Sequence, residues 1–175
     1  MVQHSPPMQR RTLLKLGIGA SVVLAVAGTG VALFQPGLQQ GHLSAASNDV
    51  MRAVARAVLD GVLPADPLLR EQALDAHLQR LDAAVAAFPA ATRAELSQLL
   101  ALLSSAPGRH ALAGLGEPWA QAGVPDIQQA LQSMRLSRLS LRQQAYHALR
   151  DLTNAAYFSD PSAWVHMGYP GPLDI

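Results

Sequence analysis

Apolar residues recur along most of this chain at intervals of three and four, the spacing that places side chains on one face of a helix. From Leu74 to Phe88, apolar positions follow steps of four, three, four and three. A second series repeats at every fourth residue and consists of Val50, Val54, Val58 and Val62. No stretch after Ala46 alternates with the period of two that marks a strand. The pattern therefore predicts an all-α fold.

Prolines and capping residues divide this pattern into a small bundle of five or six predicted helices. The first is expected to begin at Asn48 or Asp49, and the second to end at Pro89. The third begins at Thr92 and turns four leucines inward, Leu96, Leu99, Leu100 and Leu103. A fourth helix is predicted from residue 126 through 134 and a fifth over 138–158, with a short helical piece over 110–115 and a short last helix after Asp160.

An uncharged apolar segment, Leu16 to Phe34, precedes the helical region and follows a basic stretch. This order is typical of an export signal, and small residues at Ser44 and Ala46 suit a cut after Ala46. If the segment stays attached, it is long enough to anchor the chain in a bilayer. We expect residues 1–46 to form a signal peptide or membrane anchor helix, and residues 47–175 to form one helical domain.

Two adjacent arginines refine this interpretation. The stretch QRRTLLK resembles the motif read by the twin-arginine translocase, and the matching residues are Arg10, Arg11, Leu13, Leu14 and Lys15. Four glycines dilute the apolar run and weaken its helix, which is typical of twin-arginine leaders. This pathway exports proteins that have already folded. The leader therefore predicts a periplasmic destination, with association to the inner membrane if it is retained.

Charge and cysteine content exclude several classes of function. Three of the 13 basic residues lie in the leader, and the remaining ten face 12 acidic residues, so the body has no basic footprint for nucleic acid. The absence of cysteine excludes disulfides, thiol nucleophiles and thiolate metal sites.

No constellation of residues in the sequence predicts catalysis or metal binding. The six histidines are scattered, and none pairs at the spacing of four that places two imidazoles on one metal: His4, His42, His77, His110, His147 and His166. Asp75 and Asp82 flank the leucine stripe and are interpreted as a solvated edge. We expect no catalytic residue, metal site or cofactor in this chain.

Three arginines, Arg135, Arg138 and Arg142, lie three and four residues apart and would share a face of an unbroken helix. The simple interpretation is a solvated face. The alternative is a docking surface, because arginine suits fixed pairing with carboxylates across a protein interface.

Aromatic residues gather near the C-terminus. Half of the eight aromatic residues fall in a stretch of thirteen, and they are Tyr157, Phe158, Trp164 and Tyr169. They either pin the last helix to the core or form a surface that another subunit completes.

Residues 142–172 resemble the C-terminal signature of the gluconate 2-dehydrogenase subunit 3 family. The resemblance is carried by the Tyr157–Phe158 pair, the Ser-Asp-Pro sequence at residues 159–161, Trp164 and the Gly-Tyr-Pro-Gly-Pro sequence at residues 168–172. Members are small subunits with twin-arginine leaders, so the leader agrees with the signature.

The resemblance implies a non-catalytic small subunit that escorts, stabilises and co-exports a flavin dehydrogenase of the glucose-methanol-choline (GMC) type. FAD would then belong to the large partner subunit, and a cytochrome c subunit would accept electrons. The partner surface is expected to involve the three arginines and the four aromatic residues. The alternative is a free-standing periplasmic or membrane-tethered helical binding protein without a flavoprotein partner.

Overall fold

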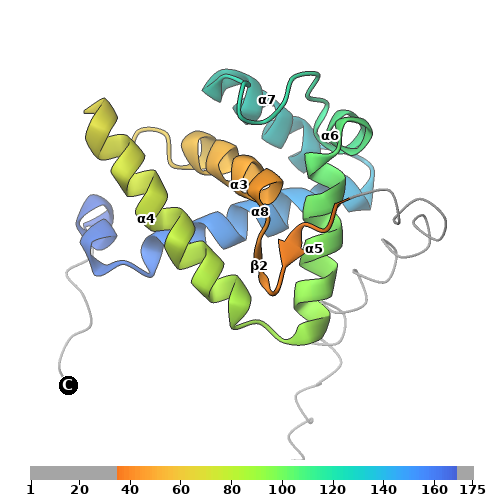
Figure 1. Ribbon diagram of the computed structural model, residues 1–175. Helices are drawn as coiled ribbons and strands as arrows, with labels where there is room; N and C mark the ends of the chain where they lie inside the picture. Colours follow the sequence, from red (N-terminus) through yellow and green to blue (C-terminus); the bar gives the residue numbers. More distant parts are fainter. Residues whose placement is uncertain (1–34, 169–175) are drawn as a thin grey trace, which may run out of the picture.

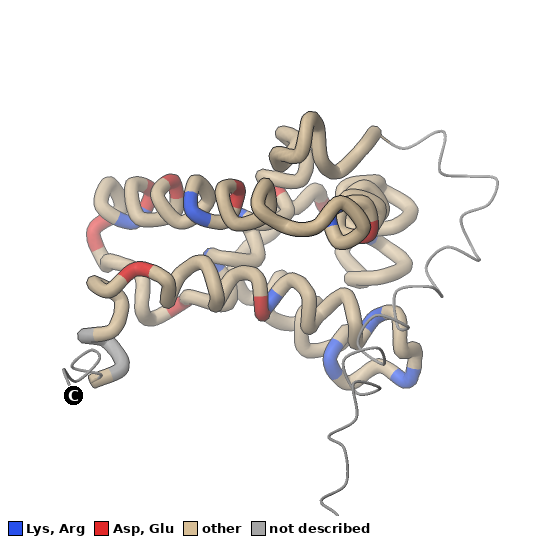
Figure 2. Tube along the Cα trace, turned by 90° about the horizontal axis from the view of Figure 1, so that it is seen from below, with Lys and Arg blue, Asp and Glu red and all other residues tan. Residues whose placement is uncertain are grey.

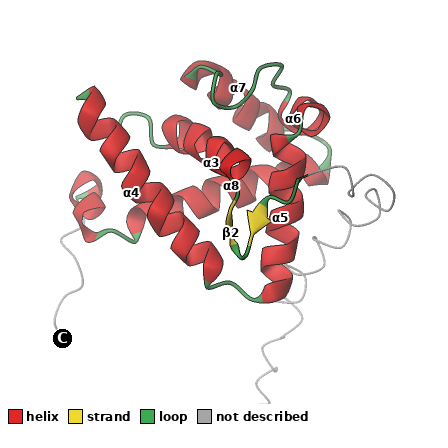
Figure 3. Ribbon diagram, viewed as in Figure 1, coloured by secondary structure: helices red, strands yellow, loops and turns green. Residues whose placement is uncertain are grey.

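The computed structural model describes residues 35–168, except for the side chains of residues 165–167 (Figures 1 and 3). Six α-helices make up most of this part, and they are α3 (Ala45–Val58), α4 (Pro67–Ala86), α5 (Ala90–Ser104), α6 (Ala106–Ala113), α7 (Val124–Arg135) and α8 (Ser140–Phe158). A hairpin of β1 (Leu38–Gln39) and β2 (His42–Leu43) precedes them, and a 3₁₀-helix, η2 (Pro161–Met167), follows. The predicted all-α character is confirmed for these residues. The predicted apolar N-terminal helix lies outside them.

Helix α3 lies at the centre of the bundle and contacts α4, α5, α7 and α8 (Figure 1). Half of its residues are buried, on nearly every side of the helix, as expected for an element surrounded by others: Ser47, Val50, Met51, Ala53, Val54, Ala55 and Ala57. The predicted valine series divides here, because Val58 is half-buried and Val62 lies beyond the end of the helix.

The predicted leucine stripe is confirmed as the inner face of α4. Its buried members are Leu74, Leu78, Leu81 and Val85. Pro67 occupies the first turn of this helix, where its missing N–H breaks no hydrogen bond. Asp66 caps the helix by accepting the backbone N–H of Leu69 at 2.9 Å.

Several helices begin earlier than predicted because serine side chains cap them. Ser44 accepts the backbone N–H of Ser47 at 3.2 Å, so α3 begins at Ala45 and not at Asn48 or Asp49. Ser105 caps α6 in the same way by accepting the N–H of Gly108 at 3.1 Å. The break expected around that serine is therefore a helix start.

The β1–β2 hairpin ties the segment before α3 into the bundle. Its two turn residues adopt positive φ angles, and the strands pair Leu38 with Leu43. The Leu38 N–H donates to Ser97 Oγ of α5 at 3.0 Å, and the Ser44 N–H donates to the carbonyl oxygen of Gly37 at 2.9 Å. Leu43 and Ser44 are buried.

The helical domain therefore includes residues that the sequence analysis assigns to the leader. A cut after Ala46 would fall inside α3 and would remove the hairpin together with the Ser44 cap. The boundary of the folded body lies before Gly37 because the hairpin packs on α5 and α4.

Candidate functional site

The predicted site residues divide into those that the structure describes and those outside it. The five residues expected to meet the translocase lie outside residues 35–168, and so does Tyr169: the five are Arg10, Arg11, Leu13, Leu14 and Lys15. Their roles stay predictions.

The three arginines do not share the face of one helix, because the chain breaks between α7 and α8, as the helices predicted over 126–134 and 138–158 imply. Arg135 is the last residue of α7, Arg138 lies in the connecting turn, and Arg142 lies in the first turn of α8. Ser137 causes the break, because its hydroxyl accepts the N–H of Leu139 at 3.2 Å and competes with helical hydrogen bonding.

The half-buried side chain of Arg142 is held by contacts within this chain. Its Nε donates to the carbonyl oxygen of Leu112 at 2.7 Å, and its Nη2 donates to Ser133 Oγ at 2.9 Å. These bonds join the end of α6 to α7 and the start of α8. Arg142 is therefore a structural residue of this end of the bundle.

The turn between α7 and α8, residues 136–139, presents apolar and basic side chains to solvent. Leu136 is 67% exposed and Leu139 is 64% exposed. Arg135 donates only to its neighbour Gln132 at 3.1 Å, and neither Arg135 nor Arg138 forms an ion pair within residues 35–168. No acidic residue occurs between Asp126 and Asp151.

The aromatic residues at the other end of α8 pack mainly within this chain. Tyr157 is buried, and its hydroxyl donates to the carbonyl oxygen of Val62 at 3.3 Å. Its ring meets that of Phe158 edge to face, with centroids 5.3 Å apart. Trp164 is half-buried and donates Nε1 to the carbonyl oxygen of Phe158 at 2.8 Å. The packing matches the interpretation in which these rings pin the last helix to the core.

An ion pair between α4 and the residue that precedes η2 completes this arrangement. Arg80 lies 3.1 Å from the carboxylate of Asp160 and donates Nε to the carbonyl oxygen of Ala156 at 3.2 Å. Asp160 accepts both the hydroxyl and the backbone N–H of Ser162, at 2.8 and 2.9 Å, as expected of a cap. These two bonds, with a smaller effect of Arg80, lower the pKa of Asp160.

The two groups of predicted partner residues lie at opposite ends of α8. Arg142 and Tyr157 are fifteen residues apart on one helix, which separates them by roughly 22 Å at 1.5 Å per residue. Figure 2 shows basic positions gathered at the end of the molecule far from the C-terminus. The arginines and the aromatic residues therefore do not form one continuous surface.

His77 is a buried titratable residue that the sequence analysis did not single out. It is fully buried in α4, and neither ring nitrogen has a hydrogen-bond partner within the described residues. Burial, and secondarily the charge of Arg80, lowers its pKa from 6.5 to about 4. The signal was present in the sequence, because His77 falls between Leu74 and Leu81 on the buried side of the stripe.

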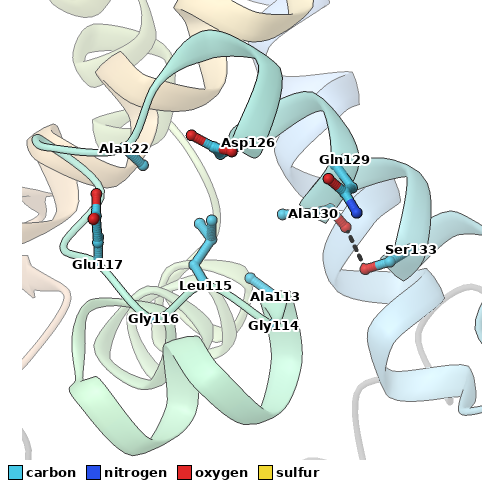
Figure 4. Close-up of a pocket in the computed structure, with 10 residues that line it drawn as sticks. All are labelled: Ala113, Gly114, Leu115, Gly116, Glu117, Ala122, Asp126, Gln129, Ala130 and Ser133. Carbon is cyan, nitrogen blue, oxygen red and sulfur yellow. Dashed lines mark hydrogen bonds between the residues drawn. The ribbon is translucent and has the colours of Figure 1, made fainter.

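A cavity of about 400 Å³ opens between the end of α6 and the first turns of α7 (Figure 4). Alanine, leucine and glycine residues form its apolar part, and four polar side chains line it: Glu117, Asp126, Gln129 and Ser133. The Ser133 hydroxyl donates to the carbonyl oxygen of Ala130 at 2.8 Å and also accepts Arg142. The cavity is within the size range of small-molecule sites.

Residues 35–168 contain neither a metal-binding cluster nor a membrane-spanning helix. In that range no three histidine or acidic side chains come close enough to hold a metal ion. Nor does any helix there combine the length and apolar character needed to cross a bilayer. Comparison with protein-family models, curated protein sequences and solved structures found no match to this chain.

Proposed function

We propose that this chain is a non-catalytic small subunit that escorts, stabilises and co-exports a GMC-type FAD-dependent dehydrogenase through the twin-arginine pathway. The observation that carries the proposal is the presence of two signatures in one chain, the Arg10–Arg11 leader motif and the aromatic sequence from Tyr157 to Pro172. FAD belongs to the large partner subunit, a cytochrome c subunit accepts its electrons, and the complex is periplasmic or associated with the inner membrane.

The fold supports this proposal at the junction with the leader. The packed body begins at Gly37, and only two residues separate it from the apolar sequence that ends at Phe34. A leader joined so closely to a packed body suits a pathway that carries folded cargo. The escort would then present the translocase with a leader whose attached domain is already folded.

We assign the partner surface to the aromatic end of α8. Phe158 and Trp164 are half-buried, so each leaves part of a large ring available to another subunit. Tyr157 supports this end of the helix from within, because it is buried and its hydroxyl donates to Val62. The available arginines, Arg135 and Arg138, lie at the far end of the helix.

The test replaces both leader arginines by lysine, R10K and R11K, in the native host and follows the flavoprotein by fractionation. The expected result is retention of both proteins in the cytoplasm. The matched control, R135K with R138K, changes two arginines in the body in the same way and should leave export intact. Arrival of the flavoprotein in the periplasm with the leader variant would disprove the escort role.

A second candidate function is a free-standing helical binding protein, and the cavity between α6 and α7 favours it. Purification of the tagged chain from its native host separates the two functions. Co-purification of a large protein with flavin absorbance supports the escort, whereas a colourless monomer supports the binding protein.

A further inference from the structure

We propose that the α7–α8 turn binds the surface of an anionic lipid bilayer. Leu136 and Leu139 would enter the boundary between headgroups and acyl chains, while Arg135 and Arg138 pair with lipid phosphates. This inference goes beyond the proposed function and does not depend on the identity of any protein partner.

The first observation is the exposure of two large apolar side chains in one short turn. Leu136 and Leu139 are 67% and 64% exposed, and they belong to a group of only four large apolar residues so exposed within residues 35–168. A single exposed leucine needs no explanation, but two at the tip of a turn form a small protruding apolar site. Burial of both leucines in a bilayer would be favourable, because it would remove apolar surface from water that remains exposed in the folded protein.

The second observation is the uncompensated positive charge around these leucines. Arg135 and Arg138 form no ion pair in the described part of the chain, and residues 127–150 contain no acid. The neighbouring helix α6 also lacks acidic residues, and its one arginine, Arg109, is buried and donates to the carbonyl oxygen of Gly116, so this helix adds no compensating negative charge. A tip of leucine and arginine at a basic end complements phosphate headgroups, because guanidinium binds phosphate oxygens in pairs.

The third observation is the position of the turn in the molecule. Figure 1 shows the α7–α8 turn and the start of the described chain on the side of the molecule away from the C-terminus. The described chain starts at Gln35, directly after the apolar sequence Leu16 to Phe34. The turn and the point where the chain leaves this apolar sequence therefore lie on the same side of the molecule in Figure 1.

The absence of cysteine allows a clean test with one label in the full chain. L139C carries an environment-sensitive dye at the turn. L68C carries the same dye on α4, where Leu68 is 68% exposed and serves as the matched control. Vesicles contain either phosphatidylglycerol mixed with phosphatidylcholine, or phosphatidylcholine alone.

The expected result is a blue shift of the dye at residue 139 with the phosphatidylglycerol vesicles, and none at residue 68. Replacing both arginines, R135Q with R138Q, should weaken partition to these vesicles about thirtyfold. The variant R93Q with R150Q removes the same charge elsewhere and should bind as the parent does. All variants keep the leader, so differences among them belong to the turn, and circular dichroism verifies that each remains folded.

Three results would overturn the proposal. They are an unshifted dye at residue 139, an equal shift with phosphatidylcholine alone, and equal partition of the two arginine variants. Burial of the dye only when a purified protein partner is added would instead assign the turn to a protein interface.

Discussion

The Asp82 carboxylate of α4 accepts the backbone N–H of Leu43 at 2.7 Å, and its second oxygen lies 2.7 Å from Nδ1 of His42. One acidic side chain therefore holds strand β2 against α4. Since β2 is followed directly by Ser44, which caps α3, this contact fixes the entry of the chain into the central helix. A residue interpreted from sequence as part of a solvated edge thus joins two parts of the fold.

We expect D82A to lower the free energy of unfolding by about 1–2 kcal/mol, because the backbone N–H of Leu43 loses its hydrogen-bond acceptor. D75A is the matched control. Asp75 is the same type of residue, two helical turns away on the same helix. It is 58% exposed and pairs only with Arg52, so its loss should lower the free energy of unfolding by less than about 1 kcal/mol. Urea unfolding measures the free energy of unfolding of both variants. Equal decreases in D82A and D75A would show that the hydrogen bond to Leu43 does not stabilise the fold.

Gly37 packs so closely on α5 that it has no room for a side chain. An added Cβ would lie 2.4 Å from the carbonyl oxygen of Ser97 and 2.7 Å from Cβ of Leu100. We expect G37A to destabilise the protein by about 1–3 kcal/mol in thermal or urea unfolding, since backbone must move. G116A is the control, because open space surrounds that position. A neutral G37A would mean that the hairpin does not pack on α5 in solution.

The position of the hairpin also predicts where a leader peptidase can act. Proteases cut exposed, flexible segments, whereas Ala46 lies in the first turn of α3 beyond a buried cap. If the leader is removed, we expect the new N-terminus to lie before Gly37. Intact mass measurement of the protein from its native host tests this directly. A mature chain that begins at Ser47 would contradict it.

His77 predicts a loss of stability in acid. Its pKa is about 4 in the folded protein and 6.5 as an ordinary value, so the unfolded chain takes up the proton first. Protonation between these values therefore favours unfolding, and the stabilisation is complete above about pH 6.5 and lost toward pH 4. Two charged or titratable groups lie near His77, Arg80 and Tyr157, and neither forms a hydrogen bond with its ring.

We expect the free energy of unfolding to fall by about 2 kcal/mol between about pH 7.5 and about pH 5. H77L should remove most of this dependence, because leucine extends the apolar stripe and takes up no proton. H147L, at an exposed histidine of α8, should leave it unchanged. The lowered pKa of Asp160 adds a loss of the same sign only below about pH 4. An unaltered pH profile in H77L would disprove the role of His77.

Local signals in the sequence were sufficient for the helices and for several of their ends. The stripe from Leu74 to Val85 needs only the helical period, and it became the inner face of α4. Asp160 and Pro161 predicted the start of η2 correctly, because a cap and a first-turn proline act within a few residues.

The sequence could not divide the predicted partner residues into internal and available ones. Arg138 and Arg142 have the same side chain and lie four residues apart, yet Arg142 is bound to Leu112 and Arg138 is not. The choice depends on α6, which reaches α8 only through the packing of the bundle. Tyr157 is likewise held by a distant segment, because its hydroxyl donates to the carbonyl oxygen of Val62, 95 residues away in the sequence.

The sequence by itself determined the helical class, the apolar faces and the leader prediction, because each depends on periodicity and neighbouring residues. Only the tertiary structure decided that residues 37–46 belong to the body, that the arginines and aromatic residues lie at opposite ends of α8, and that His77 is buried without a partner. The physical reason is that burial and hydrogen bonding between distant segments depend on how helices pack, and local patterns carry no record of that packing.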